Sequence, residues 1–143
     1  MEQPTRGNDA DPLARRALLH EDVTRRILGA FFHVYNRLGF GFLESVYANA
    51  LSHEMTKRGL RVEREVGIEV RYDGRVAGVF RTDVLVNRVV LVELKARRAL
   101  SPTDLQQLLN YLRATQLEVG LLLHFGPRPS FRRLVSSDEI DPR

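Results

Sequence analysis

Two consecutive apolar segments that carry charged residues constrain the fold of this chain more than any other feature. Residues 80–86 (FRTDVLV) and 89–96 (VVLVELKA) are rich in β-branched residues and predict two strands of a hairpin. Asp83 lies within the first strand, and Glu93 and Lys95 lie near the end of the second. A buried carboxylate without a partner costs several kcal/mol. The two acids and the lysine therefore indicate a shared cation, for which a divalent metal is the simplest candidate.

The register of this hairpin decides whether the two acids meet. If Asn87 and Arg88 formed a simple two-residue loop, Asp83 would lie opposite Val92 and point away from Glu93. A three-residue loop or a bulge would place Asp83 opposite Glu93. We therefore predict an irregular hairpin, and a structure with the two acids on opposite faces of the sheet would contradict the metal site.

Lysine is rare in this chain, which has 20 Arg and only two Lys, Lys57 and Lys95. A lysine kept beside two acids suggests a need for a compact ammonium group with three rotatable donors. Such a group can hold a water nucleophile or neutralise charge that develops on a phosphate. The alternative is a structural pair of Glu93 and Lys95 at the rim of the sheet.

An acid on one strand followed by E-x-K on the next resembles the core motif of the PD-(D/E)XK nuclease superfamily. Residues 41–47 (GFLESVY) resemble the signature of one bacterial family within it, the GxxExxY family, and the resemblance covers residues 21–135. Two positions depart from the family pattern, namely His124 before Phe125-Gly126 and Phe40 in the turn. The matching segments, in order, are residues 38–41, 41–47, 81–86, 93–96, 107–112, 120–123 and 125–126.

The resemblance implies a fold and a reaction. The fold is α/β, a restriction-endonuclease-like sandwich with a mixed central β-sheet flanked by helices. The reaction is metal-dependent hydrolysis of phosphodiester bonds, most simply in DNA, with Mg²⁺ or Mn²⁺ as cofactor. Asp83, Glu93, Glu44 and the backbone carbonyl of Leu94 would be ligands of the metal. An alternative is a catalytically silent nucleic-acid-binding or assembly module on the same fold.

Other residues near the motif have more than one interpretation each. Glu44 either completes the metal site or interacts favourably with the positive end of the helix dipole. Tyr47 either positions Glu44, contacts nucleic acid by stacking on a base, or packs in the core. Gln107 either orients the attacking water or lies on a polar helix flank with a half-buried Tyr111. Tyr111 is also a candidate contact to nucleic acid, as are Arg97 and Arg98.

Length and composition fit one domain. A chain of 143 residues with 43% hydrophobic content buries one core, and the absence of cysteine excludes disulfides and thiolate metal sites. We expect a flexible arm over residues 1–20, the nuclease-like domain over 21–135 and a disordered tail over 136–143. No signal peptide or membrane-spanning run is evident, so a cytoplasmic location is expected.

The charge of the chain bears on its partners. Residues 22–135 hold 18 basic and 11 acidic residues, a net charge of +7. This excess favours a polyanion, so we expect nucleic acid as the partner, whereas the alternative is a role in solubility alone. A homodimer is also possible, since many relatives pair.

The remaining elements are predicted from periodicity and turn residues. Helices are expected over residues 22–38, with Asp22 as N-cap, and over 43–57, with Val46 in the core. A short strand at residues 60–64 precedes a meander that turns at Asp73-Gly74, with one solvated face that includes Glu65. A helix capped by Ser101 leads to a buried strand over residues 119–125, parallel to the E-x-K strand.

Overall fold

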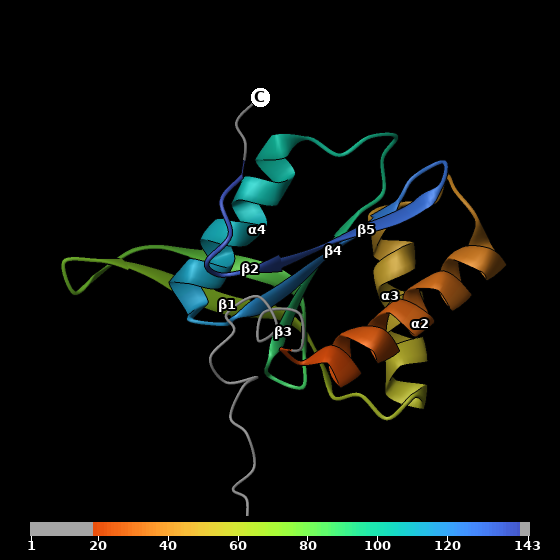
Figure 1. Ribbon diagram of the computed structural model, residues 1–143, viewed down its shortest axis with the longest axis horizontal. Coiled ribbons are helices and arrows are strands. Elements are labelled where there is room, and N and C mark those ends of the chain that lie inside the picture. Colours follow the sequence, from red (N-terminus) through yellow and green to blue (C-terminus); the bar gives the residue numbers. More distant parts are fainter. Residues whose placement is uncertain (1–18, 141–143) are drawn as a thin grey trace, which may run out of the picture.

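The protein is described by a computed structural model, which places residues 19–140. Eight helices and strands follow one another along this part of the chain (Figure 1). The expected arm over residues 1–20 lies almost wholly outside the described residues. In order, the elements are α2 (Glu21–Leu38), α3 (Glu44–Lys57), β1 (Val62–Tyr72), β2 (Arg75–Val86), β3 (Val90–Lys95), α4 (Pro102–Thr115), β4 (Val119–Phe125) and β5 (Pro129–Val135).

The five strands form one mixed sheet in the order β1-β2-β3-β4-β5. The first three form an antiparallel meander, and β5 returns antiparallel to β4. Strands β3 and β4 are parallel, with Leu94 opposite Leu123, because α4 carries the chain back over the sheet between them. The predicted crossover through the helix after the E-x-K strand is thus confirmed.

Helices cover both faces of the sheet, which gives the predicted α/β sandwich (Figure 1). α2 and α3 pack on one face over a core that includes Phe31, Leu51, Val92 and Phe125. α4 packs on the other face over a smaller core built around Leu91. Side chains alternate between the faces of a strand, so Glu93 and Lys95 follow Leu91 onto the α4 side.

The ends of the helices agree only in part with the sequence-based expectations. α4 begins as predicted: Ser101 Oγ accepts a hydrogen bond from the Asp104 N–H, and the Asp104 carboxylate accepts one from the Ser101 N–H. Asp22, however, is not an N-cap. His20 occupies that position in a left-handed conformation, and Asp22 lies in the first turn of α2. Val46, expected in the core, is exposed at the surface.

The hairpin of β1 and β2 extends beyond the body of the domain (Figure 1). Its turn is at Asp73-Gly74, as predicted, and both residues have positive φ angles of 50° and 73°. Strand β1 is continuous from Val62, rather than a short strand followed by a second one. Its distal half is exposed on both faces, so the single solvated face expected for the meander is limited to the part near the sheet.

The described part of the segment after β5, residues 136–140, contacts the body of the domain, and the expected disordered tail over 136–143 stays a prediction. The Ser136 N–H donates to the Glu118 carbonyl, and Asp138 Oδ2 accepts from the Val135 N–H. Ile140 packs against the core beneath α4. Residues 141–143 lie outside the described part of the chain. Among the described helices, none is long and apolar enough to cross a membrane.

Candidate active site

The connection between β2 and β3 sets the geometry of the site. It contains three residues, 87–89, and pairs Val86 with Val90 and Val84 with Val92. Asn87 and Arg88 have positive φ angles of 50° and 57°. Asn87 is fixed by two hydrogen bonds to the backbone of Arg61. The predicted irregular hairpin is therefore confirmed, and continuing its register places Asp83 opposite Glu93.

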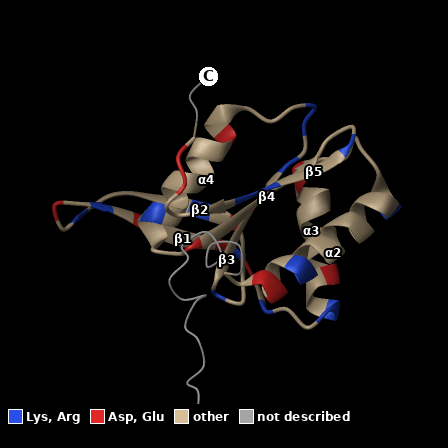
Figure 2. Ribbon diagram, in the orientation of Figure 1, with Lys and Arg blue, Asp and Glu red and all other residues tan. Residues whose placement is uncertain are grey.

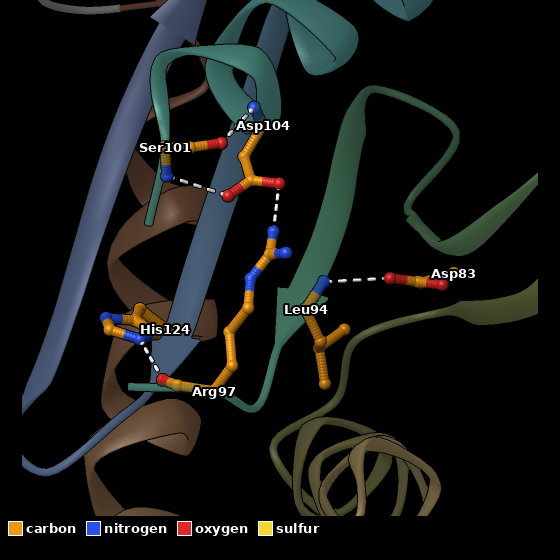
Figure 3. A network of polar contacts seen from close by, with 6 residues as sticks. All are labelled: Asp83, Leu94, Arg97, Ser101, Asp104 and His124. Carbon is orange, nitrogen blue, oxygen red and sulfur yellow. Dashed lines mark hydrogen bonds and ion pairs between the residues drawn. The ribbon is translucent and has the colours of Figure 1, made fainter. Parts of the chain in front are cut away.

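Beyond Val84, hydrogen bonds to the side chains of Asp83 and Glu93 replace the backbone hydrogen bonds that would otherwise join β2 and β3. The Asp83 N–H donates to Glu93 Oε1 at 3.2 Å, and the Leu94 N–H donates to Asp83 Oδ2 at 2.8 Å (Figure 3). Thr82 Oγ1 also donates to Glu93 Oε1, at 3.2 Å. The strands thus part at the site, and each carboxylate is oriented by at least one backbone N–H.

Burial and mutual repulsion shape the protonation of this pair. Glu93 is almost wholly buried. Its pKa rises from the ordinary 4.5 to about 8, first because burial disfavours the charged form and second because the Asp83 carboxylate lies beside it. A cation between the two groups would relieve both effects. Their carboxylate oxygens are the ligands that Mg²⁺ and Mn²⁺ prefer.

Glu44 reaches the edge of this pair from the first turn of α3. Burial raises its pKa, and the Asp83 carboxylate raises it further, whereas the charge of Lys95 lowers it. Glu44 and Asp83 line one pocket, together with Glu65. Within residues 19–140, however, no three acidic or histidine side chains lie close enough to hold a metal ion jointly as they stand. Two direct carboxylate ligands, with Glu44 beside them, are what the geometry fits.

Glu65 is a pocket residue that the sequence analysis assigned to the solvated face of the meander. It lies where the register of β1 and β2 would place it opposite Asp83, but it is left out of the regular pairing. Its φ angle is 52°, which is uncommon for a residue other than glycine and marks an irregularity in the strand. The register of β1 against β2, which places Glu65 and Asp83 on the same face, is the signal that could have identified it.

The segment after Lys95 is fixed by a polar network (Figure 3). Arg97 forms an ion pair with Asp104, which also caps α4, and the Arg97 carbonyl contacts His124 Nε2. Burial acts to raise the pKa of Asp104, but the Ser101 N–H and the Arg97 guanidinium outweigh it and lower the pKa. His124 Nδ1 also contacts Ser130 Oγ, so both ring nitrogens of His124 have partners within the protein. Arg97 is thus occupied within the protein.

Tyr111 approaches the carboxylate pair from α4. Its ring stacks on that of Phe80 with centroids 3.7 Å apart and an interplanar angle of 10°. Burial raises the pKa of its hydroxyl, and the negative charges of Glu93 and Asp83 raise it further. Gln107 lies one helical turn earlier with an exposed side chain. α4 thus brings Tyr111 to the site, while the role of Gln107 in catalysis and that of Tyr111 as a contact to nucleic acid stay predictions.

Tyr47 is a core residue and not a surface contact. It is fully buried, stacks on Phe125 at 4.2 Å, and its hydroxyl donates to the Gly39 carbonyl and accepts from the Phe42 N–H. Direct contact between Tyr47 and nucleic acid, one of the three interpretations of this residue, is incompatible with that burial. Instead Tyr47 closes the loop that leads to Glu44, in which Gly41 has a φ of 115°.

A model of the PD-(D/E)XK nuclease superfamily matches residues 21–134 of the chain. The chain belongs to this superfamily. The match spans α2 to β5 and so includes Glu44, Asp83, Glu93 and Lys95. Members of the superfamily are typically metal-dependent, which agrees with the donor set of the carboxylate pair. No curated protein matches the chain at a significant level.

A solved structure supports the superfamily fold. The crystal structure of SSO0001 is similar to the chain with a TM-score of 0.51 and 18% sequence identity. The similarity covers 87% of this chain but only 63% of that one, so the chain spans less than two thirds of its solved relative. At this identity the comparison concerns the fold alone, and it is consistent with the restriction-endonuclease-like arrangement expected from the sequence.

Proposed function

We propose that this PD-(D/E)XK domain is a divalent-metal-dependent nuclease that hydrolyses phosphodiester bonds, with DNA as its substrate. The observation that carries the proposal is the facing pair of Asp83 and Glu93, with the pKa of Glu93 raised to about 8 and Lys95 on the same strand. A structural pair of Glu93 and Lys95 at the rim of the sheet would not call for a second carboxylate that raises the pKa of the first. A metal-binding pair requires two carboxylates close to each other.

Each residue of the candidate active site has a distinct role in this proposal. Asp83 and Glu93 would hold Mg²⁺ or Mn²⁺, with the Leu94 carbonyl and Glu44 as further ligands, directly or through water. The metal, when bound, polarises the phosphate and lowers the pKa of a coordinated water. Lys95 holds a positive charge beside the carboxylates, where it orients the water or stabilises the charged transition state.

The pattern of Gly41, Glu44 and Tyr47 supports the finer assignment to the GxxExxY family. Gly41 adopts a backbone conformation that favours glycine, and Tyr47 fixes the loop through its hydroxyl. Glu44 lies between them and faces Asp83 closely enough for their charges to interact. Gly41 and Tyr47 thus fix the loop in the conformation that places the Glu44 carboxylate beside Asp83 and Glu93.

The test is cleavage of labelled single-stranded DNA, duplex DNA and RNA in Mg²⁺ and in Mn²⁺. Wild type is compared with Asp83→Ala, Lys95→Ala and Lys57→Ala. Lys57 is the only other lysine and pairs with Glu54, away from the site, so it is the matched control. Cleavage by wild type and Lys57→Ala alone supports the proposal. Equal activity of Asp83→Ala rejects it, and binding without cleavage by any form supports the silent binding module.

A further inference from the structure

Four large apolar side chains are exposed around Glu44. They belong to the α2–α3 loop and the first turn of α3, and we call them the loop patch: Phe40, Phe42, Leu43 and Val46. Leu43 is 76% exposed, the largest exposure among the large hydrophobic side chains of the described residues. A cluster of this kind at one place on a soluble domain marks a binding surface more often than chance exposure does.

The loop patch is held in a fixed conformation. The buried Tyr47 hydroxyl joins the Gly39 carbonyl to the Phe42 N–H, and the Gly39 N–H donates to the Tyr35 carbonyl at 2.8 Å. The Phe42 ring packs edge-on against Tyr47 with centroids 6.0 Å apart. A surface that is already ordered loses little conformational entropy when a ligand binds. The loop therefore presents its side chains ready for contact.

The loop patch is continuous with the candidate active site. In the sequence, Glu44 lies between Leu43 and Val46 of the loop patch. In space, Glu44 is close enough to Asp83 and Lys95 for their charges to interact with its carboxylate. Arg98 places its guanidinium 5.7 Å from the centre of the Phe40 ring, so a cation borders the apolar surface. Further Lys and Arg lie on the β3–α4 connection and at the β4–β5 turn, at the same end of the molecule as the α2–α3 loop (Figure 2).

Apolar and aromatic side chains next to arginines suit one ligand in particular. Single-stranded nucleic acid presents its phosphates to cations and its free base faces to apolar side chains, and each base stacked on an aromatic ring contributes about 1–3 kcal/mol. In a duplex the base faces are covered by their neighbours, and exposing them costs a few kcal/mol. The combination of patch and arginines therefore favours unpaired bases over paired ones.

We propose that the loop patch stacks unpaired bases beside the scissile phosphate, so that the nuclease acts on single-stranded DNA or on the single-stranded part of a junction. The inference rests on the proposed function and adds the substrate class to it. Phe42 and Leu43 are the residues that contact the bases, and Arg98 holds a neighbouring phosphate. Tyr47 is a positioning residue, because it acts only through the loop.

The test measures binding, so that it does not depend on cleavage. Fluorescence anisotropy with labelled oligo(dT) and a duplex of equal length, in Ca²⁺, is recorded for wild type, Leu43→Ala, Phe42→Ala and Val79→Ala. Val79 is 66% exposed on β2, away from the loop, and serves as the control. We expect about tenfold weaker binding of oligo(dT) by Phe42→Ala, which loses one stacked base, and a smaller loss by Leu43→Ala, which loses apolar contact alone. Duplex binding and Val79→Ala should remain as in wild type. Thermal unfolding of each variant shows whether the fold is kept.

An oligonucleotide with abasic sites isolates the contribution of the bases. It keeps the phosphates, so wild type should bind it no more tightly than Phe42→Ala binds oligo(dT), and the variant should lose little further affinity. Equal losses on abasic and normal strands would overturn stacking. Unchanged affinity combined with a shift from dimer to monomer in sedimentation would overturn it too, and would assign the loop patch to a second copy of the chain.

The cleavage assay, applied to the same variants, separates this inference from the proposed function. Cleavage of duplex and single strands at equal rates, with no effect of Leu43→Ala, removes the inference and leaves the nuclease. Binding of oligo(dT) that depends on Leu43 without any metal-dependent cleavage removes the nuclease and supports the base-binding surface.

Discussion

The Leu94 N–H donates to Asp83 Oδ2 at 2.8 Å, across the point where β2 and β3 part. Glu93 Oε1 completes the exchange by accepting from the Asp83 N–H. The carboxylates thus substitute for two strand partners, which satisfies backbone donors that would otherwise be left without acceptors. This arrangement forces the acids together whether or not a metal is bound, and it makes their removal a structural as well as a chemical change.

We predict that divalent metal stabilises the folded protein through this pair. At a hundredfold excess over its Kd, Mn²⁺ should raise the free energy of unfolding of wild type by about 2.7 kcal/mol, which is several degrees in Tm. Asp83→Asn should keep the shape of the side chain and lose most of the increase. Differential scanning fluorimetry at pH 8 with and without Mn²⁺ measures this. An equal increase in the variant would mean that the metal binds elsewhere.

Glu93 makes the stability of the metal-free protein depend on pH. Its pKa is about 8 in the folded protein and near 4.5 in the unfolded chain, so the folded state binds one more proton between these values. Stability should therefore fall as pH rises from 5 to 8 and level off above. Glu93→Gln should remove this slope and exceed wild type in stability at pH 8.5. Urea unfolding from pH 5 to 9 in EDTA shows whether the slope disappears.

The proximity of Asp83 and Glu93 could be predicted because side chains alternate along a strand and directly paired residues share a face of the sheet. The alternation of Leu91, Glu93 and Lys95 left only one register in which Asp83 could face Glu93, and the three-residue connection supplies it. The capping box at Ser101 could also be predicted from the sequence, since it depends on two residues that are three positions apart in the chain. In both cases the decisive interaction is local in the sequence.

The parts that could not be predicted depend on contacts between distant segments or on unusual backbone angles. Glu65 lines the pocket from a position with a positive φ that interrupts the regular pairing of β1 and β2, and no pattern in the sequence reveals that irregularity. Tyr47 is buried because Phe125, from β4, packs on its ring. Val46 has the spacing of a core residue on α3, yet it lies in the first turn of the helix and is 37% exposed.

Tyr47→Phe should destabilise the α2–α3 loop. The change leaves the Gly39 carbonyl and the Phe42 N–H without the hydroxyl that joins them, at a cost of about 1–3 kcal/mol in the free energy of unfolding. Cleavage should fall as well, because Glu44 follows the loop directly. Tyr72→Phe, at the exposed tip of the hairpin, is the control. Chemical denaturation and hydrogen exchange at Phe42 report the effect, and an unchanged exchange rate would contradict it.

The stack of Phe80 on Tyr111 should matter for the position of α4 more than for chemistry. Tyr111→Ala removes the stack and should lower the free energy of unfolding by about 1 kcal/mol or more. Tyr111→Phe keeps the ring and should leave stability near that of wild type. If Tyr111→Phe nevertheless lowers the cleavage rate with KM unchanged, the hydroxyl acts in the site. Steady-state kinetics on both variants separates the two roles.

Lys95→Arg tests whether the site needs a lysine or only a positive charge. The guanidinium is planar and presents its donors in a fixed fork, so it cannot reproduce the compact ammonium group of Lys95 beside Glu93. We expect a loss of about 10²–10³ in kcat, with metal binding and Tm close to those of wild type. Lys57→Arg provides the matched control, since the chain otherwise uses arginine for its positive charges. Full activity of Lys95→Arg would reduce the role of this residue to charge balance with the two carboxylates.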